Sequence, residues 1–135
     1  MAYGQWVYMV ISNQTKSGSL KIKKLNLSCG KLYEWDNKDT GKEVKDVENQ
    51  IIKPLGKMGI ASCGRSDAAM GTEGSYEIWD GEDRVCKVNW SCPWSGSNKL
   101  TILEVDDSRY AAQSEGANLG SGALGHVTIK VSRLA

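Results

Sequence analysis

Short segments in which apolar and polar residues alternate make up much of the chain, and this period of two is typical of half-buried β-strands. The clearest case is near the end, where Val127, Ile129 and Val131 share one face of an expected final strand. About eight or nine such segments follow one another, with turn residues roughly every 8–15 positions and no alternation with helices. The pattern predicts an all-β fold, a single-domain antiparallel β-sandwich over residues 1–135.

Three local features refine this prediction. Residues 3–12 are continuously apolar or weakly polar, which predicts a strand covered on both faces. The alternation slips by one position at Lys24, and a β-bulge would account for the slip. An aromatic strand is expected at 30–35, followed by a polar loop at 36–39.

The nearly neutral charge of the chain limits its partners. Its 17 Lys and Arg residues against 16 Asp and Glu give a formal net charge of +1. General binding to nucleic acid needs a basic excess, so we expect no nucleic-acid partner. The longest apolar run, at 6–11, has six residues, whereas a helix that spans a bilayer needs about 20. Only peripheral membrane association is therefore expected.

The four cysteines stand at 29, 63, 86 and 92. No charged segment followed by an apolar core opens the chain, so we expect a protein made in soluble form without a signal peptide, either cytoplasmic or released. Five residues separate Cys86 from Cys92, instead of the two typical of zinc ribbons and redox motifs, and there is one histidine. We therefore expect mostly reduced thiols, no bound metal and no cofactor.

Residues with catalytic potential do not form a recognisable site. Residues 120–125 match G-x-G-x-x-G, but a strand follows them where a dinucleotide site needs a helix, so a tight β-connection is expected. His126 is interpreted as a surface histidine on a strand. Asp106 and Asp107 could form a pair of catalytic carboxylates, but they are adjacent, and neighbouring residues on a strand point to opposite faces. We therefore do not expect them to act as a catalytic pair. A hydrolase would need a cleft with a nucleophile beside His126, and we predict that the protein is not an enzyme.

The aromatic residues carry more information. There are five Trp, five Tyr and no Phe, so every aromatic side chain has a polar group, as is common at interfaces. Trp90 falls on the inward face of its predicted strand, whereas Trp94 follows Pro93 into a polar loop and is expected to be exposed. Tyr33 and Trp35 also run into a loop. Exposed tryptophans near lysines suit lipid headgroups or sugars, so a lectin-like, carbohydrate-binding β-sandwich is the alternative to a lipid-binding one.

A series of motifs runs through the chain in a recognisable order. They are Met1-Ala2-Tyr3-Gly4-Gln5-Trp6-Val7, Gly30-Lys31-Leu32, Asp36-Asn37-Lys38-Asp39, Ile52-Lys53-Pro54, Cys63-Gly64-Arg65-Ser66-Asp67-Ala68-Ala69, Trp90-Ser91-Cys92-Pro93-Trp94 and Ser121-Gly122-Ala123-Leu124-Gly125. In this series the chain closely resembles the aegerolysin family, and the resemblance covers nearly its whole length.

The resemblance implies a β-sandwich that binds membrane lipids, typically of the sphingolipid class. It implies the receptor-recognising subunit of a two-component pore-forming cytolysin or insecticidal toxin that acts at target-cell membranes. Haemolysis is an activity of such pairs. The partner is a protein of the membrane-attack-complex/perforin class, which supplies the transmembrane β-hairpins.

The resemblance also implies which residues bind lipid. They are Trp6, Lys31, Met70, Trp94 and Lys99. Two departures from the family pattern, at Cys29 and Met70, lie at or beside these positions. Lys31 belongs to Cys29-Gly30-Lys31, where the family has Trp-Gly-Lys, and Met70 replaces a glutamate that selects the lipid in some members. The exact lipid class is therefore the property that transfers least from the family.

Overall fold

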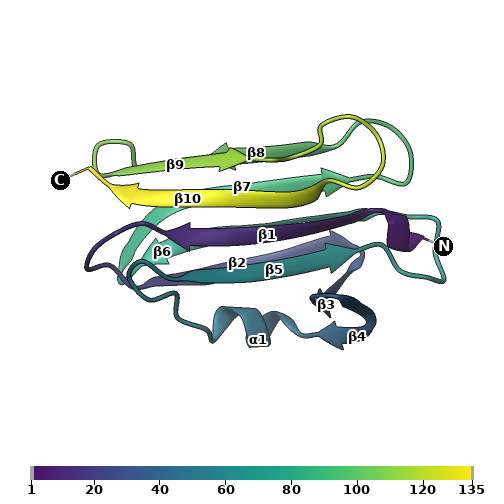
Figure 1. Cartoon of the computed structure of the whole chain (residues 1–135), viewed down its shortest axis with the longest axis horizontal. Coiled ribbons are helices and arrows are strands. Elements are labelled where there is room, and N and C mark those ends of the chain that lie inside the picture. Colours follow the sequence, from purple (N-terminus) through teal and green to yellow (C-terminus); the bar gives the residue numbers. More distant parts are fainter. Residues whose placement is uncertain (1, 135) are drawn as a thin grey trace.

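The structure, a computed structural model, describes residues 2–134; Met1 of the opening motif and Ala135 lie outside the described residues. Two β-sheets pack face to face, with their strands running along the length of the molecule (Figure 1). The elements are η1 (Ala2–Gly4, a 3-10 helix), β1 (Trp6–Asn13), β2 (Leu20–Cys29), β3 (Lys31–Glu34), β4 (Asn37–Lys42), α1 (Val44–Glu48), β5 (Lys57–Cys63), β6 (Thr72–Asp80), β7 (Asp83–Cys92), β8 (Lys99–Leu103), β9 (Tyr110–Glu115) and β10 (Gly125–Arg133). A six-stranded sheet has the order β4-β3-β5-β1-β10-β9, and a four-stranded sheet has the order β2-β6-β7-β8.

The predicted all-β sandwich is confirmed, and one strand pairing adds to it. Neighbouring strands of the described chain pair antiparallel, except that β1 and β10 run parallel with Val7 opposite Gly125. The first and last strands therefore lie together inside the six-stranded sheet. Alternation along a strand does not reveal its neighbour, and no turn joins these two strands to signal the pairing.

The strand β1 is covered unequally on its two faces, so the expectation that residues 3–12 are covered on both is wrong. Val7 and Met9 are 0% exposed and point into the core. Trp6 and Tyr8 are half-buried on the outer face of the sheet. The segment is continuously apolar because aromatic side chains also cluster on that outer face.

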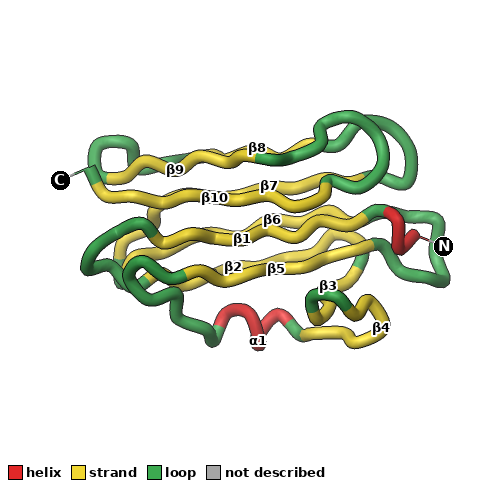
Figure 2. The backbone as a smooth tube through the Cα atoms, in the orientation of Figure 1, coloured by secondary structure: helices red, strands yellow, loops and turns green. Residues whose placement is uncertain are grey.

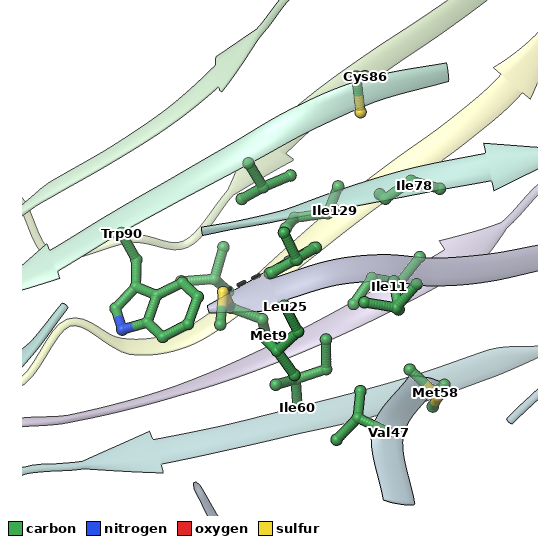
Figure 3. Close-up of a cluster of buried hydrophobic side chains, with 14 of the residues drawn as sticks. Met9, Ile11, Leu25, Val47, Met58, Ile60, Ile78, Cys86, Trp90 and Ile129 are labelled. Carbon is green, nitrogen blue, oxygen red and sulfur yellow. Dashed lines mark hydrogen bonds between the residues drawn. The ribbon is translucent and has the colours of Figure 1, made fainter. Parts of the chain in front are cut away.

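The core lies between the two sheets, and side chains from both meet in it (Figure 3). Trp90 is 1% exposed and donates its indole N–H to Thr72 Oγ1 at 3.0 Å. The inward face of β10 is confirmed, because Val127, Ile129 and Val131 are all buried. Trp90 therefore belongs to the core, as its place in the alternation predicted.

Two local predictions on the strands have opposite outcomes. The bulge at Lys24 is confirmed, because this residue has a φ of 55° and lies in an irregular step of the pairing between β2 and β6. The prediction of a polar loop at 36–39 is wrong, because β4 begins at Asn37 and pairs with β3. Only Trp35 and Asp36 connect the two strands, and a φ of 73° at Asp36 makes this tight turn possible.

Loops gather at the two ends of the sandwich (Figure 2). The end that carries the N-terminus, called the N-terminal end, holds the loops at 64–71, 93–98 and 116–124. The opposite end, called the C-terminal end, holds the loops at 49–56 and 104–109. No helix of the described chain is long and apolar enough to cross a membrane.

Candidate functional site

An open hollow at the N-terminal end brings together two of the predicted lipid-binding residues. It has a volume of about 400 Å³, and its walls include Cys29, Met70, Pro93 and Trp94. Trp94 is 42% exposed and Met70 is 56% exposed. The predicted exposure of Trp94 is confirmed, and Met70 is a second accessible apolar side chain in the same hollow. We call this surface the Trp94 hollow.

Strand pairing fixes the two loops that form the Trp94 hollow. Thr72 of β6 pairs with Cys92 of β7, so the loop that ends in Met70 and the loop that carries Trp94 leave adjacent strands at the same end. Gly71 has no room for a side chain, because a Cβ atom there would collide with the Cys92 carbonyl group. Close contact between the two backbones therefore holds Met70 and Trp94 near each other.

A polar groove continues from the Trp94 hollow along the outer face of the four-stranded sheet. It has a volume of about 430 Å³ and shares Glu73 and Ser91 with the hollow. Lys99 is exposed at this groove. The polar sequence after Trp94 suggested that Lys99 belongs to the same loop, and this is wrong, because Lys99 is the first residue of β8 and pairs with Ser91. The Asn89 Oδ1 atom is buried there without a hydrogen-bond partner among the described residues. The groove thus offers a cation beside the hollow.

The two departures from the family pattern lie on one surface. Cys29 and Met70 both line a further hollow of about 360 Å³, together with Arg65. Burial, followed by the negative charge of Glu73, raises the pKa of the Cys29 thiol, so this thiol is neutral at pH 7. Where the family pattern places an indole and a carboxylate, this chain therefore presents a neutral thiol and a thioether.

Trp6 and Lys31 occupy a different surface, on the outer face of the six-stranded sheet. Trp6 lines a pocket of about 410 Å³ with Tyr3 and Trp35. The ring centroids of Trp6 and Trp35 are 5.7 Å apart, and Tyr8 stacks on Trp35 with a centroid distance of 4.1 Å. We call this surface the aromatic pocket.

The lysines beside the aromatic pocket are already engaged. Lys31 Nζ donates to the Tyr3 hydroxyl group at 2.7 Å and lies 4.6 Å from the centroid of the Tyr3 ring. Lys38 Nζ donates to the Tyr3 carbonyl oxygen at 2.7 Å and lies 5.4 Å from the centroid of the Trp6 ring. The structure thus divides the five predicted residues into two groups. Met70, Trp94 and Lys99 lie at the Trp94 hollow and its groove, whereas Trp6 and Lys31 lie at the aromatic pocket.

Sequence reasoning missed part of the aromatic pocket. The sole histidine, His126, is exposed on β10 as predicted. However, its ring packs edge-on against the rings of Trp6, Tyr8 and Trp35, with centroid distances of 5.4, 5.8 and 5.0 Å, respectively. The parallel pairing of β1 with β10 places His126 opposite Tyr8. Tyr33, expected in an exposed setting, is only 1% exposed. A nonlocal pairing assembles this cluster, so no local pattern signals it.

The residues weighed for catalysis or metal binding take structural positions. Residues 120–125 connect β9 to β10, as predicted. Asp106 and Asp107 lie in the loop before β9, and Asp106 is 3.7 Å from the Arg109 guanidinium group. Burial raises the pKa of Cys86 to about 12, and all four cysteines are free. Among the described residues, no group of three or more His, Cys, Asp and Glu side chains is arranged to hold a metal ion.

Comparisons with known proteins agree along the whole chain. The family model described as Aegerolysin matches residues 4–134. Ostreolysin A6 from Pleurotus ostreatus is 39% identical over 132 residues, which cover 96% of this chain and 95% of that protein. Asp-hemolysin from Aspergillus fumigatus is 34% identical, with 98% of this chain and 95% of that protein covered.

A solved structure extends the agreement to three dimensions. The crystal structure of IP-1A from Alcaligenes faecalis has a TM-score of 0.91 and 34% sequence identity, with 99% of this chain and 94% of that chain covered. The residues that the family model matches include the Trp94 hollow and, apart from Tyr3, the lining of the aromatic pocket. The family model and the relatives lead to one conclusion: the chain belongs to the aegerolysin family.

Proposed function

We propose that the protein binds membrane lipids through the Trp94 hollow and acts as the receptor-recognising subunit of a two-component pore-forming cytolysin. One observation carries this proposal: the exposed Trp94 and Met70 share a hollow with cationic side chains close by, Arg65 and Lys99. A lipid surface is complementary to this arrangement, since it offers an apolar layer beneath charged phosphates. Membership of the aegerolysin family, whose members are lipid-binding and cytolysin-related proteins, supports the same function.

The energetics fit reversible peripheral binding. Moving an apolar side chain such as Trp94 or Met70 out of water is worth about 1.5–3 kcal/mol. Each of the cations Arg65 and Lys99 adds about 1 kcal/mol near an anionic surface. The sum, roughly 5–8 kcal/mol before ordering costs, corresponds to micromolar affinity at best. Contacts to a specific headgroup, or assembly with a second protein, would supply the remaining affinity.

We propose that the bound lipid is of the sphingolipid class. Its amide and hydroxyl groups are hydrogen-bond donors at the depth of the membrane interface. The hydroxyl groups of Ser28, Ser91 and Thr101 line the polar groove as acceptors for them. Met70 stands in the adjoining hollow where the family pattern has a glutamate, so no carboxylate occupies that position.

The proposed activity is binding, and a separate perforin-class protein would open the pore. Such a partner would add its transmembrane hairpins after this chain has selected the membrane. The lytic activity named in the relative Asp-hemolysin supports a role in membrane damage. We propose that the protein is released and acts at target-cell membranes.

Cosedimentation with liposomes of defined composition tests the lipid proposal. Wild-type protein is expected to bind liposomes that contain sphingomyelin or ceramide phosphoethanolamine more tightly than phosphatidylcholine alone. Trp94→Ala and Met70→Ala should each weaken binding, whereas the control Ile51→Ala should not. Ile51 is exposed to a similar extent as Met70 (59% against 56%) but lies in a loop at the C-terminal end. Equal binding to all liposomes, or normal binding by both hollow variants, would contradict the proposal.

A lectin-like function is the second candidate, and the polar groove favours it. Ser75, Asn89 and Thr101 lie across three neighbouring strands and could hydrogen-bond a sugar. Liposomes without any glycan separate the two functions. Binding to them supports lipid recognition, whereas binding only to glycolipid-containing liposomes supports the lectin.

A further inference from the structure

The loop at 116–124, which connects β9 to β10, is folded onto itself by one asparagine. The Asn118 amide donates to the carbonyl oxygens of Ser121 and Ala123, both at 3.0 Å, and the Asn118 Oδ1 atom accepts the Gly120 N–H at 3.0 Å. The Asn118 backbone N–H donates to the Leu124 carbonyl oxygen, also at 3.0 Å. This loop therefore has a defined conformation although it lies at the surface.

A second asparagine ties this loop to the one that carries Trp94. Asn98 is 3% exposed, and its amide donates to the carbonyl oxygens of Asn118 and Gly122 at 2.9 and 3.0 Å. Its backbone N–H donates to the Gly120 carbonyl oxygen at 2.8 Å. The two loops are thus fixed to each other at the N-terminal end, and a surface that meets one of them also meets the other (Figure 1).

Leu119 presents an apolar side chain from this rigid loop. It stands between Asn118 and Gly120, whose carbonyl oxygens are both held by Asn98. The Leu119 side chain is 58% exposed, close to the 56% of Met70 in the Trp94 hollow. Residues 116–125 include no charged side chain. The loop therefore offers an accessible leucine with no charge in the segment that carries it.

The backbone of the loop is suited to a lipid surface. A carbonyl group that leaves water without a hydrogen bond costs free energy, and lipid acyl chains offer no replacement donor. The carbonyl oxygens at 118 and at 120–124 already accept hydrogen bonds within the protein. This segment can therefore enter the membrane interface without leaving these acceptors unpaired and without desolvating a charge. A bilayer is the occupant that fits.

We infer that the loop at 116–124 is a second membrane-contacting element, in which Leu119 enters the apolar layer beside Trp94. Asn98 acts as a positioning residue, because its hydrogen bonds set the place of the Leu119 loop relative to the Trp94 loop. The inference rests on the proposed function, in which the Trp94 hollow binds lipid. It adds a contact residue outside the lining of that hollow.

Leu119→Ala tests this contact with a leucine at the opposite end as its control. Binding to sphingomyelin liposomes should weaken about fivefold, because most of the apolar side chain is lost from the interface. Leu134→Ala should bind as the wild type does, since Leu134 is similarly exposed (55%) but follows β10 at the C-terminal end. The melting temperatures of both variants should equal that of the wild type, since neither leucine is in the core.

An environment-sensitive fluorophore locates the loop directly. The fluorophore NBD is attached to Leu119→Cys, or to Leu134→Cys as the control, in a Cys29→Ser background that removes the one partly exposed thiol. Addition of sphingomyelin liposomes should shift the emission from position 119 to the blue, and lipids with spin-labelled acyl chains should quench it. The emission from position 134 should not change.

Three outcomes would overturn the inference. They are wild-type binding by Leu119→Ala, unchanged emission from position 119 in liposome-bound protein, and a shift that appears without liposomes as the protein concentration rises, which would indicate contact with a second copy of the chain. If Trp94→Ala still weakens liposome binding in any of these cases, the proposed function stands. Failure of wild-type protein to bind the liposomes would overturn both.

Discussion

Trp94 and Trp6 were both predicted to bind lipid, yet their surroundings differ. Trp94 is 42% exposed in a loop, and among the described residues no ring stacks on it. Trp6 is packed between Trp35 and His126, and Lys38 lies over its face. A free indole can enter a membrane without losing protein contacts, whereas Trp6 would have to give them up. Freedom from such contacts, more than residue type, therefore distinguishes Trp94, the proposed lipid contact, from Trp6.

The largest expected effect separates a core tryptophan from the loop tryptophan. Trp90→Ala should lower the free energy of unfolding by about 3–5 kcal/mol, because it leaves a cavity and removes the hydrogen bond to Thr72. Trp94→Ala should change it by less than about 0.5 kcal/mol, as expected for a surface substitution. Urea denaturation measures both. Similar losses in the two variants would mean that the loop has a structural role.

A smaller effect is expected at the aromatic pocket. Trp35 contacts the rings of Trp6, Tyr8, Tyr33 and His126. Trp35→Ala should therefore lower the free energy of unfolding by about 2 kcal/mol, since each aromatic pair contributes about 0.5–1.5 kcal/mol. Liposome binding should persist below the melting temperature of the variant. Loss of binding by folded Trp35→Ala protein would extend the membrane contact to this pocket.

The cations near the Trp94 hollow should give a still smaller effect that depends on salt. Arg65→Gln and Lys99→Gln should each weaken binding to liposomes with anionic lipid about fivefold, equivalent to about 1 kcal/mol. The difference should shrink in 1 M salt, where the screening length is about 3 Å. Lys16→Gln is the control, as an exposed lysine before β2. Equal effects of all three variants would indicate attraction by overall charge.

The smallest expected effect concerns the reactivity of the cysteine thiols. Cys29 is the one partly exposed cysteine of the four, and the other three are buried. A maleimide should modify Cys29 alone in the folded protein, and slowly, because burial raises its thiol pKa. The intact mass under non-reducing, denaturing conditions should equal that of the reduced chain. A lower mass would reveal a disulfide.

The sequence was sufficient for the elements whose signals are local. Alternation located the core face of β10 and the burial of Trp90, and the slip at Lys24 marked a real bulge. Proline and small polar neighbours indicated the exposure of Trp94. The signals that failed are nonlocal, such as the parallel pairing that brings His126 to Tyr8.

The candidate site shows the same limit. The resemblance named five residues, but residue identity alone did not show that they belong to two surfaces. Strand order separates Lys31 in the six-stranded sheet from Lys99 in the four-stranded one. Local patterns also gave no sign that the exposed Leu55 has positive φ, because leucine is an unusual residue for that position.

Fluorescence quenching by lipids with brominated acyl chains tests the central claim most directly. Trp94→Phe and Trp6→Phe keep an apolar ring at each position and so preserve binding, while each removes one indole from the emission. If Trp94 enters the membrane, most of the quenching seen with wild-type protein should disappear in Trp94→Phe and persist in Trp6→Phe. The reverse pattern, with quenching retained in Trp94→Phe and lost in Trp6→Phe, would contradict the assignment of the Trp94 hollow as the membrane-binding surface.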